Sequence, residues 1–458
     1  MAINQRTEQL AHEDIRKLII RFSTPTIIGM LVMASYNIVD GIFVGRGVGS
    51  LALSAIGVYF PLMRIYMAFG MLIGIGATSR VSLALGRKDH DEAEKILGNA
   101  ITLSIVISFI LTTICYLFLE SIISAFGGTG VVYNYAVDYT KVSLIGAFFQ
   151  TITFGLNSVI RGEGNPKTAM FTMIISSLIN FALNPIFIFV LHWGIRGSAW
   201  ATVIAQIIAV IWISKYYLGS QSVLKLHVKN LRPDYRIIKS IFSIGISPFA
   251  MQMVGSVVFI IFNKLLAIYG GQHAIGAGRI GNNITMVILM PIFGLNQGCQ
   301  PIIGYNYGAK NYARVKETLK QALIAATTIC IGGFLLVEIF SENIISLFVK
   351  DDPLVMSFAP RALRILLLML PLLGFQIISA NYFQAIGKAS RSLILTLSRQ
   401  AIFLIPLLLI LPHYYGMDGI WLSEPISDAS SSILAAILIF SERTNLNIMT
   451  KEHLESAA

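Results

Sequence analysis

Carboxylic acids occur at two places inside long apolar stretches of the sequence. Asp40 follows Asn37 by three positions near the N-terminus, and Glu424 and Asp428 stand four positions apart near the C-terminus. A charged side chain at the centre of a bilayer costs at least about 2.5–3.5 kcal/mol on insertion scales, so an acid kept there needs a reason. A carboxylate shielded from water could bind a proton or a small cation. The acids therefore predict cation chemistry in the interior of a membrane protein.

Asp40 is expected to have amide partners. Asn37 lies on the same face of a helix as Asp40. Asn180 and Asn184 share a face of a second helix, directly before Pro185. Proline leaves a backbone carbonyl without its helical hydrogen bond, and nearby amides can satisfy that carbonyl or help it to hold an ion. The pattern predicts a polar pocket in the N-terminal half.

Two alternatives remain for these residues. Asp40 lies five positions from Gly45, roughly 7–8 Å from the end of the helix, where it could cap the helix or pair with Arg46 near the outer interface. The two asparagines could simply join neighbouring helices, as amides often do in membranes. We favour a functional role for Asp40, and the similar estimated depth of the asparagines links them to it.

The second acidic pair is harder to explain by packing. Glu424 and Asp428 share a helical face on either side of Pro425, and the predicted helix holds no basic residue. Asp428 lies nine positions from Gly419, roughly 13–14 Å deep and near the midplane. Like charges held close cannot both ionise cheaply, so one acid is expected to hold a proton. The residues predicted to couple a cation are Asp40, Asn37, Asn180, Asn184, Glu424 and Asp428, and the candidates for a substrate cleft are Tyr36, Gln252, Gln297, Gln300, Gln376 and Asn381.

The elements that must position these residues are membrane-spanning helices. Of 458 residues, 55% are hydrophobic and 12% are charged, about half the charged share of a soluble domain. Apolar runs of about 20 residues, the length that crosses a bilayer as a helix, recur along the chain. The fold is predicted to be an all-α polytopic membrane protein with twelve helices, at about 16–44, 51–79, 94–118, 133–160, 167–190, 197–218, 238–268, 276–305, 316–339, 355–385, 391–411 and 418–441.

The basic residues predict the orientation. The chain has 34 Lys and Arg against 23 Asp and Glu, and 25 of the 34, Arg399 among them, are assigned to the side that holds the N-terminus. Cytoplasmic loops are enriched in Lys and Arg, so both termini are predicted to be cytoplasmic in a multi-pass protein of the inner (cytoplasmic) membrane. No basic patch with interleaved aromatics occurs, which argues against a nucleic-acid partner.

An internal repeat predicts the domain organisation. Shifting the sequence by about 222 residues places Pro25 on Pro248 and Gly197 on Gly419. Six helices separate the copies, so the halves have the same orientation, as in parallel-repeat transporters, and could rock against each other. We predict a six-helix bundle over 1–218, a cytoplasmic linker at 219–236, a second bundle over 237–445 and a cytoplasmic tail at 446–458.

Motifs for enzymes and cofactors are missing from the sequence. It contains no GxxxxGK[ST] loop and no HExxH, and its seven histidines do not cluster with acids or cysteines. Cys115, Cys299 and Cys330 stand apart in apolar stretches and are expected to be packed thiols. We therefore predict that the chain is not an enzyme and uses no cofactor and no bound metal beyond a coupling ion.

Several segments resemble one family of transporters. Gln300–Lys310, which reads QPIIGYNYGAK, is similar to the signature after the eighth helix of the multidrug and toxic compound extrusion (MATE) family. Arg161–Gly164 followed by Asn165 and Pro166, the segment from Gly419 to Asp428 and the segment from Asn37 to Asp40 also resemble that family, its bacterial multidrug branch above all.

This resemblance implies two pseudo-symmetric six-helix bundles in a V shape with a central cleft. It also implies export of amphipathic, often cationic, compounds in exchange for H⁺ or Na⁺ by alternating access. Asp40 and Asn180 match the family's cation site, a candidate Na⁺ site, in the first bundle. One departure stands out, because related bacterial members often have an acid immediately before the fifth-helix proline, where this sequence has Asn184.

We therefore expect a secondary antiporter, a monomer in the lipid bilayer whose partners are small amphipathic molecules. The first alternative is a lipid or lipid-linked-sugar flippase, which would need a strongly basic cleft, and few Lys or Arg are assigned to the middle of a span. A membrane-embedded enzyme or a passive channel is less favoured.

Overall fold

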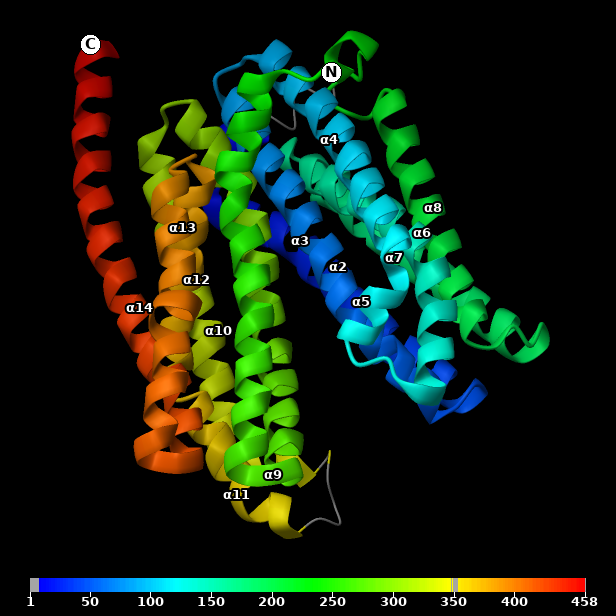
Figure 1. Ribbon diagram of the computed structural model, residues 1–458. Coiled ribbons are helices and arrows are strands. Elements are labelled where there is room, and N and C mark those ends of the chain that lie inside the picture. Colours follow the sequence, from blue (N-terminus) through cyan, green and yellow to red (C-terminus); the bar gives the residue numbers. More distant parts are fainter. Residues whose placement is uncertain (1–7, 347, 349–352, 458) are drawn as a thin grey trace. The chain divides into compact units, whose positions relative to one another are not determined.

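A computed structural model describes residues 8–346, 348 and 353–457, and within these ranges all regular secondary structure is helical (Figure 1). The chain divides into two compact units. Unit 1 contains Arg21–Phe249 together with the segment before Asp14, and unit 2 contains Asp14–Ile20 together with the segment that begins at Ala250. Unit 1 therefore includes the predicted linker, residues 219–236.

Unit 1 is built from long apolar helices joined by short turns (Figure 1). Its elements are α2 (Ile15–Gly47), α3 (Ser50–Gly86), α4 (His90–Leu117), the short α5 (Leu119–Ala125), α6 (Gly130–Gly162), α7 (Pro166–Pro185) with the π-helix η1 (Ile186–Val190), α8 (Gly194–Leu218), the 3₁₀-helix η2 (Val228–Leu231) and the start of α9 (Tyr235–Gly308). Asn165 caps α7 by accepting a hydrogen bond from the backbone N of Thr168 at 3.2 Å, as a residue at the start of a helix commonly does.

Unit 2 continues α9 and ends with the long helix α14. Its remaining elements are α10 (Tyr312–Ser346), α11 (Pro353–Leu366), α12 (Leu370–Ala385), α13 (Ala389–Leu397), the π-helix η3 (Ser398–Leu404) and α14 (Ile405–Ala457). Two glycines with positive φ interrupt these long helices. Gly271 (φ 66°) breaks α9, and Gly416 (φ 56°) breaks α14. Glycine adopts this backbone region without steric cost, so each break marks a reversal between two helices.

The predicted number of spans agrees with the structure. Ten helices of the described residues are long and apolar enough to cross a bilayer, and α11 with α12 makes an eleventh. One of the ten is the 63-residue segment Ala389–Lys451, about 95 Å long at 1.5 Å per residue and so about three times the hydrocarbon thickness. Its break at Gly416 gives two spans, and the total is twelve.

One predicted helix differs in shape. The span expected over 355–385 consists of α11 and α12, which meet at an angle of 44°. Pro371 stands in the first turn of α12, where its missing N–H costs no hydrogen bond. A proline at this position starts a helix, so the predicted span over 355–385 consists of two helical pieces.

Each unit has its own apolar core. In unit 1 the core includes Tyr59, Tyr66 and Leu144, and in unit 2 it includes Trp421 and Leu408. The three cysteines are buried and free, which confirms the prediction of packed thiols.

Candidate functional site

Asp40 on α2 is contacted by polar side chains from two other helices of unit 1. The Nδ2 of Asn184, at the end of α7, donates a hydrogen bond to Asp40 Oδ1 at 2.6 Å. The hydroxyl of Ser198, in the second turn of α8, donates to the same oxygen at 2.8 Å. The predicted partner Asn184 and the predicted acid are thus brought together, and α8 provides the second donor.

A second set of contacts extends this cluster. Asn184 Nδ2 also donates to Asn180 Oδ1 at 2.8 Å, and Asn180 Nδ2 donates to the hydroxyl of Thr202 at 3.0 Å. The Tyr36 and Thr202 hydroxyls lie 3.4 Å apart. Asn180 and Asn184 are 2% and 0% exposed, so the network is closed to water on that side. We call Tyr36, Asp40, Asn180, Asn184, Ser198 and Thr202 the Asp40 cluster.

The Asp40 cluster contains an oxygen atom that no described residue uses and that could contact a bound ion. Asn184 Oδ1 is buried and has no hydrogen-bond partner among the described residues. Within the same part of the chain no ion pair joins Asp40 to a basic residue, and Arg46, the alternative partner, does not contact it. An acid whose neighbours are neutral keeps a net negative charge when ionised, which a proton or Na⁺ can neutralise.

The local sequence explains why the asparagines face Asp40. Asn180 and Asn184 are one helical turn apart, which places both on one face of α7. Directly after them Pro185 ends α7, and η1 continues with π-helical hydrogen bonding. Single π-turns in helices occur frequently at functional sites. The side chain of Asn37 lies outside the described part of the structure.

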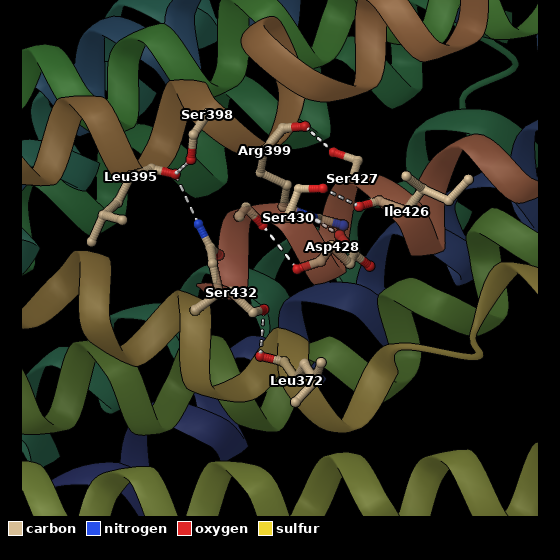
Figure 2. Close-up of polar contacts among 11 residues, drawn as sticks. Leu372, Leu395, Ser398, Arg399, Ile426, Ser427, Asp428, Ser430 and Ser432 are labelled. Atoms are coloured by element: carbon tan, nitrogen blue, oxygen red, sulfur yellow. Dashed lines mark hydrogen bonds and ion pairs between the residues drawn. The ribbon is translucent and has the colours of Figure 1, made fainter. Parts of the chain in front are cut away.

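The acids of unit 2 have a partner that the sequence analysis missed. Arg399 Nε lies 2.6 Å from Asp428 Oδ1, and the side chains are 19% and 5% exposed (Figure 2). Arg399 had been assigned to the cytoplasmic side, and this assignment was wrong because the residue lies in η3, inside the eleventh span. The absence of a base from the helix of Asp428 therefore does not mean the absence of a counter-charge.

Glu424 lies in the same group of charges. It interacts electrostatically with both Arg399 and Asp428, one turn from Asp428 on α14. No described residue makes a hydrogen bond to its carboxylate, whereas Asp428 is held by Arg399. We call Arg399, Glu424 and Asp428 the Arg399 cluster.

The π-helix η3 fixes the position of Arg399. The Ser427 hydroxyl donates to the backbone carbonyl of Arg399, and the Ser398 hydroxyl donates to the carbonyl of Leu395 at 2.9 Å (Figure 2). Gln376 Nε2 on α12 donates to that same carbonyl at 2.9 Å. Side chains thus satisfy carbonyl groups near the change from α- to π-helix, which holds the backbone in a single position.

Two of the predicted cleft residues join neighbouring helices by hydrogen bonds. Gln376 is 3% exposed and donates a hydrogen bond to the carbonyl of Leu395. Asn381, also 3% exposed, donates to the carbonyl of Asn296 at 3.0 Å. Gln300 is buried in α9, and Gln252 and Gln297 are half-buried there. Tyr36, the sixth, belongs to the Asp40 cluster through Thr202.

Three residues of the clusters were not predicted: Ser198, Thr202 and Arg399. A signal existed for each. Ser198 and Thr202 are four apart in the predicted sixth helix, and hydroxyls with that spacing share a face. Arg399 lies eight positions inside the predicted eleventh helix, about 12 Å from its start, so it is expected near the midplane, as Asp428 is.

The chain is similar to transport proteins over nearly its whole length. The family model MatE matches it twice, over residues 25–186 and 248–410, in agreement with the internal repeat. The multidrug export protein MepA of Staphylococcus haemolyticus (strain JCSC1435) is 30% identical over 446 residues, covering 97% of this chain and 98% of that protein. The protein of the same name from Staphylococcus aureus (strain MSSA476) is 28% identical over 453 residues, covering 98% and 100%.

Solved structures agree with these relatives. An outward-facing conformation of a multidrug resistance MATE family transporter of the MOP superfamily matches with a TM-score of 0.90 at 27% identity, covering 96% of this chain and 98% of that chain. The crystal structure of MATE in complex with MaD3S matches with a TM-score of 0.89 at 27% identity, covering 97% and 98%.

Proposed function

Because the chain belongs to the multidrug and toxic compound extrusion family, we propose that it is a secondary antiporter that exports amphipathic, cationic compounds in exchange for H⁺ or Na⁺ by alternating access. Multidrug efflux by a membrane-spanning protein is the function of the family. The exchange, the substrate class and the coupling ion are the proposal. We propose that this export crosses the cytoplasmic membrane with both termini inside the cell, which the excess of Lys and Arg on one side supports.

The observation that carries the proposal is the set of contacts of Asp40. Its carboxylate lies in a membrane-spanning helix, and its hydrogen-bond donors among the described residues are the neutral side chains of Asn184 and Ser198. Such donors stabilise the ionised form when the coupling ion has left. A bound proton needs only the carboxylate, whereas Na⁺ would also need neighbouring oxygens, for which the unpaired Asn184 Oδ1 and the Ser198 hydroxyl are candidates.

Exchange requires that the ion and the substrate oppose each other. If binding of the ion weakens binding of the substrate, the substrate must by linkage weaken binding of the ion by the same factor. Asp40 can provide this coupling, because a positively charged substrate and a positive ion would compete for a single negative charge.

In unit 2 we assign the exchangeable charge to Glu424. Arg399 neutralises Asp428 across 2.6 Å, so that pair serves to hold the helices of unit 2 together. Glu424 is the acid of the Arg399 cluster without a hydrogen bond from the described residues. It is therefore the group of this cluster that can accept a proton without breaking a direct contact.

A flippase remains the alternative, and the Arg399 cluster argues against it. A lipid phosphate in a central cleft would need unneutralised basic groups. Arg399, which lies inside a span, is already paired with Asp428, and the cluster holds two acids for its one base.

The test uses the purified chain in proteoliposomes loaded with ethidium. A pH gradient and a Na⁺ gradient are imposed separately, and efflux is followed by fluorescence. We expect one gradient to drive efflux in the wild type and to lose its effect in Asp40→Asn. The matched control is Asp138→Asn, since Asp138 is an acid of unit 1 that is paired with Arg196 at 2.7 Å and exposed. Efflux that neither gradient drives, or gradient-driven efflux by Asp40→Asn at the wild-type rate, contradicts the proposal.

A further inference from the structure

The segment between α8 and α9, residues 219–234, is hydrogen-bonded to the N-terminal part of α4. The backbone N of Lys225 donates to Glu94 Oε1 at 3.1 Å, and the backbone N of Asp234 donates to Asn99 Oδ1 at 2.8 Å. Between these points the Thr102 hydroxyl donates to the carbonyl of Leu231 at 2.7 Å. The segment therefore has a fixed course over α4.

Close packing at Gly98 completes this attachment. A Cβ added to Gly98 would lie 2.2 Å from the backbone oxygen of Asn230, so no other residue fits at this position without displacing the segment. At the start of the segment, Glu163 Oε2, directly after α6, accepts from the Ser222 hydroxyl at 2.8 Å and from the backbone N of Leu224 at 3.2 Å. The segment and α4 thus form one continuous, hydrogen-bonded surface of unit 1.

That surface contains a cavity of about 430 Å³. Its lining comes from α4, from the segment that includes η2 and from the first residue of α9: Lys95, Asn99, Lys229, Asn230, Arg232, Pro233, Asp234 and Tyr235. The amide of Asn99 is already used, since its Nδ2 donates to the carbonyl of Lys95 at 3.0 Å and its Oδ1 accepts from Asp234. The exposed basic groups of the lining carry charge that a ligand could neutralise.

The cavity has a positive charge. Lys95, Lys229 and Arg232 are exposed, and none of them makes an ion pair with a described residue. The single acid of the lining, Asp234, accepts a hydrogen bond from the backbone N of Arg236 at 2.8 Å. Three bases against one acid leave a formal charge of +2, and ammonium and guanidinium groups are the side chains that bind phosphate.

The place of the cavity in the fold favours a lipid over a soluble anion. Lys95 lies in the second turn of the spanning helix α4, and Tyr235 begins the spanning helix α9. The spans predicted at 94–118 and 238–268 begin beside the cavity, which favours a position at the level of the headgroups. Val228 is 82% exposed and Tyr235 is 76% exposed, and apolar and aromatic side chains at this level favour the membrane interface.

We propose that this cavity binds the phosphate headgroup of an anionic lipid on the side of the membrane that the basic loops assign to the cytoplasm. Lys229 and Arg232 contact the phosphate, Lys95 adds a third positive charge, and Tyr235 lies against the interface. Basic pockets between membrane helices recognise lipid headgroups in this way. The site belongs to unit 1 alone and is separate from the Asp40 cluster.

The experiment measures lipid binding to the purified full chain by native mass spectrometry in detergent. The probe is phosphatidylglycerol, with phosphatidylcholine as the neutral lipid and sodium phosphate as the free anion. The test variant is Lys229→Gln with Arg232→Gln. The control variant, Lys215→Gln with Lys320→Gln, removes the same charge from two exposed lysines outside the cavity lining.

We expect the wild type to bind phosphatidylglycerol at least about tenfold more tightly than phosphatidylcholine, and the test variant to lose about tenfold while the control stays within about twofold. Equal thermal midpoints of the two variants establish that both are folded. Unchanged binding by the test variant, or an equal loss in the control, overturns the proposal. Displacement of phosphatidylglycerol by an equal concentration of sodium phosphate also overturns it, because the cavity would then bind a soluble anion.

Discussion

The amide nitrogen of Asn184 lies 2.6 Å from a carboxylate oxygen of Asp40 and 2.8 Å from the side-chain oxygen of Asn180. One amide group thus joins the acid of α2 to the polar face of α7. Related bacterial members of the family often have an acid at this position, immediately before the fifth-helix proline. A neutral residue here leaves Asp40 as the sole negative charge of the Asp40 cluster.

The role of this amide is tested by two substitutions of Asn184. Asn184→Leu removes the donor from both Asp40 and Asn180, and hydrogen bonds to charged groups contribute about 1.5–3 kcal/mol, so we expect ion-driven efflux to fall by about tenfold or more. Asn184→Asp places two carboxyl groups within hydrogen-bond distance, where they can share one proton. This variant should retain efflux driven by a pH gradient. Wild-type efflux by Asn184→Leu in proteoliposomes would show that the contact is not used.

Ser198 and Thr202 provide a matched pair one turn apart on α8. Ser198 donates directly to Asp40, whereas Thr202 contacts Asn180 and Tyr36. We expect Ser198→Ala to reduce the initial rate of ethidium efflux by about tenfold, the equivalent of one charge-assisted hydrogen bond, and Thr202→Val to reduce it less. A larger loss of efflux in Thr202→Val than in Ser198→Ala would mean that the Ser198 hydroxyl bound to Asp40 is not needed for efflux.

The Arg399–Asp428 pair is expected to stabilise unit 2. Removing one partner of a buried ion pair leaves an uncompensated charge and costs about 3–5 kcal/mol, whereas replacing both by apolar residues is often neutral. We predict that Arg399→Met and Asp428→Leu each lower the thermal midpoint in detergent, and that the double variant recovers most of the loss. Additive losses in the double variant would argue that the two side chains act independently.

Glu424 is predicted to behave differently from its neighbour. Glu424→Gln keeps the shape of a side chain that accepts no hydrogen bond from the described residues, so the thermal midpoint should change little. If Glu424 exchanges protons during transport, efflux driven by a pH gradient should fall by about tenfold, within the range typical of positioned acids and bases. The control is Glu338→Gln, an exposed acid on α10. Full efflux by Glu424→Gln would remove this residue from the exchange.

Contacts within one helix could be predicted from the sequence, because helical spacing fixes which residues share a face. This holds for Asn180 with Asn184 and for Glu424 with Asp428. Contacts between helices were predicted only where polar residues at similar depth stand out, as for Asp40 and Asn184, since a helix that is apolar all round shows no preferred face and its rotation is unknown. Ser198, the α8 partner of Asp40, was missed for this reason.

Charge counting was the other source of error. Arg399 was assigned to the basic side because it follows Lys388 and Arg391 closely in the sequence. A basic residue is expected to be cytoplasmic only when nothing inside the membrane can neutralise it, and here Asp428 does so. The depth of Arg399 in its helix, compared with that of Asp428, would have predicted the pair.

The most direct test of the central claim measures ion release during substrate binding. Ethidium is added to the purified chain in detergent with weak buffer, and released protons and Na⁺ are recorded by a pH indicator and a Na⁺ electrode. If Asp40 is the shared negative charge, the wild type should release about one ion per bound ethidium, and Asp40→Asn should release none. Equal release by Asp40→Asn, or a wild type that binds ethidium without releasing either ion, would contradict the account.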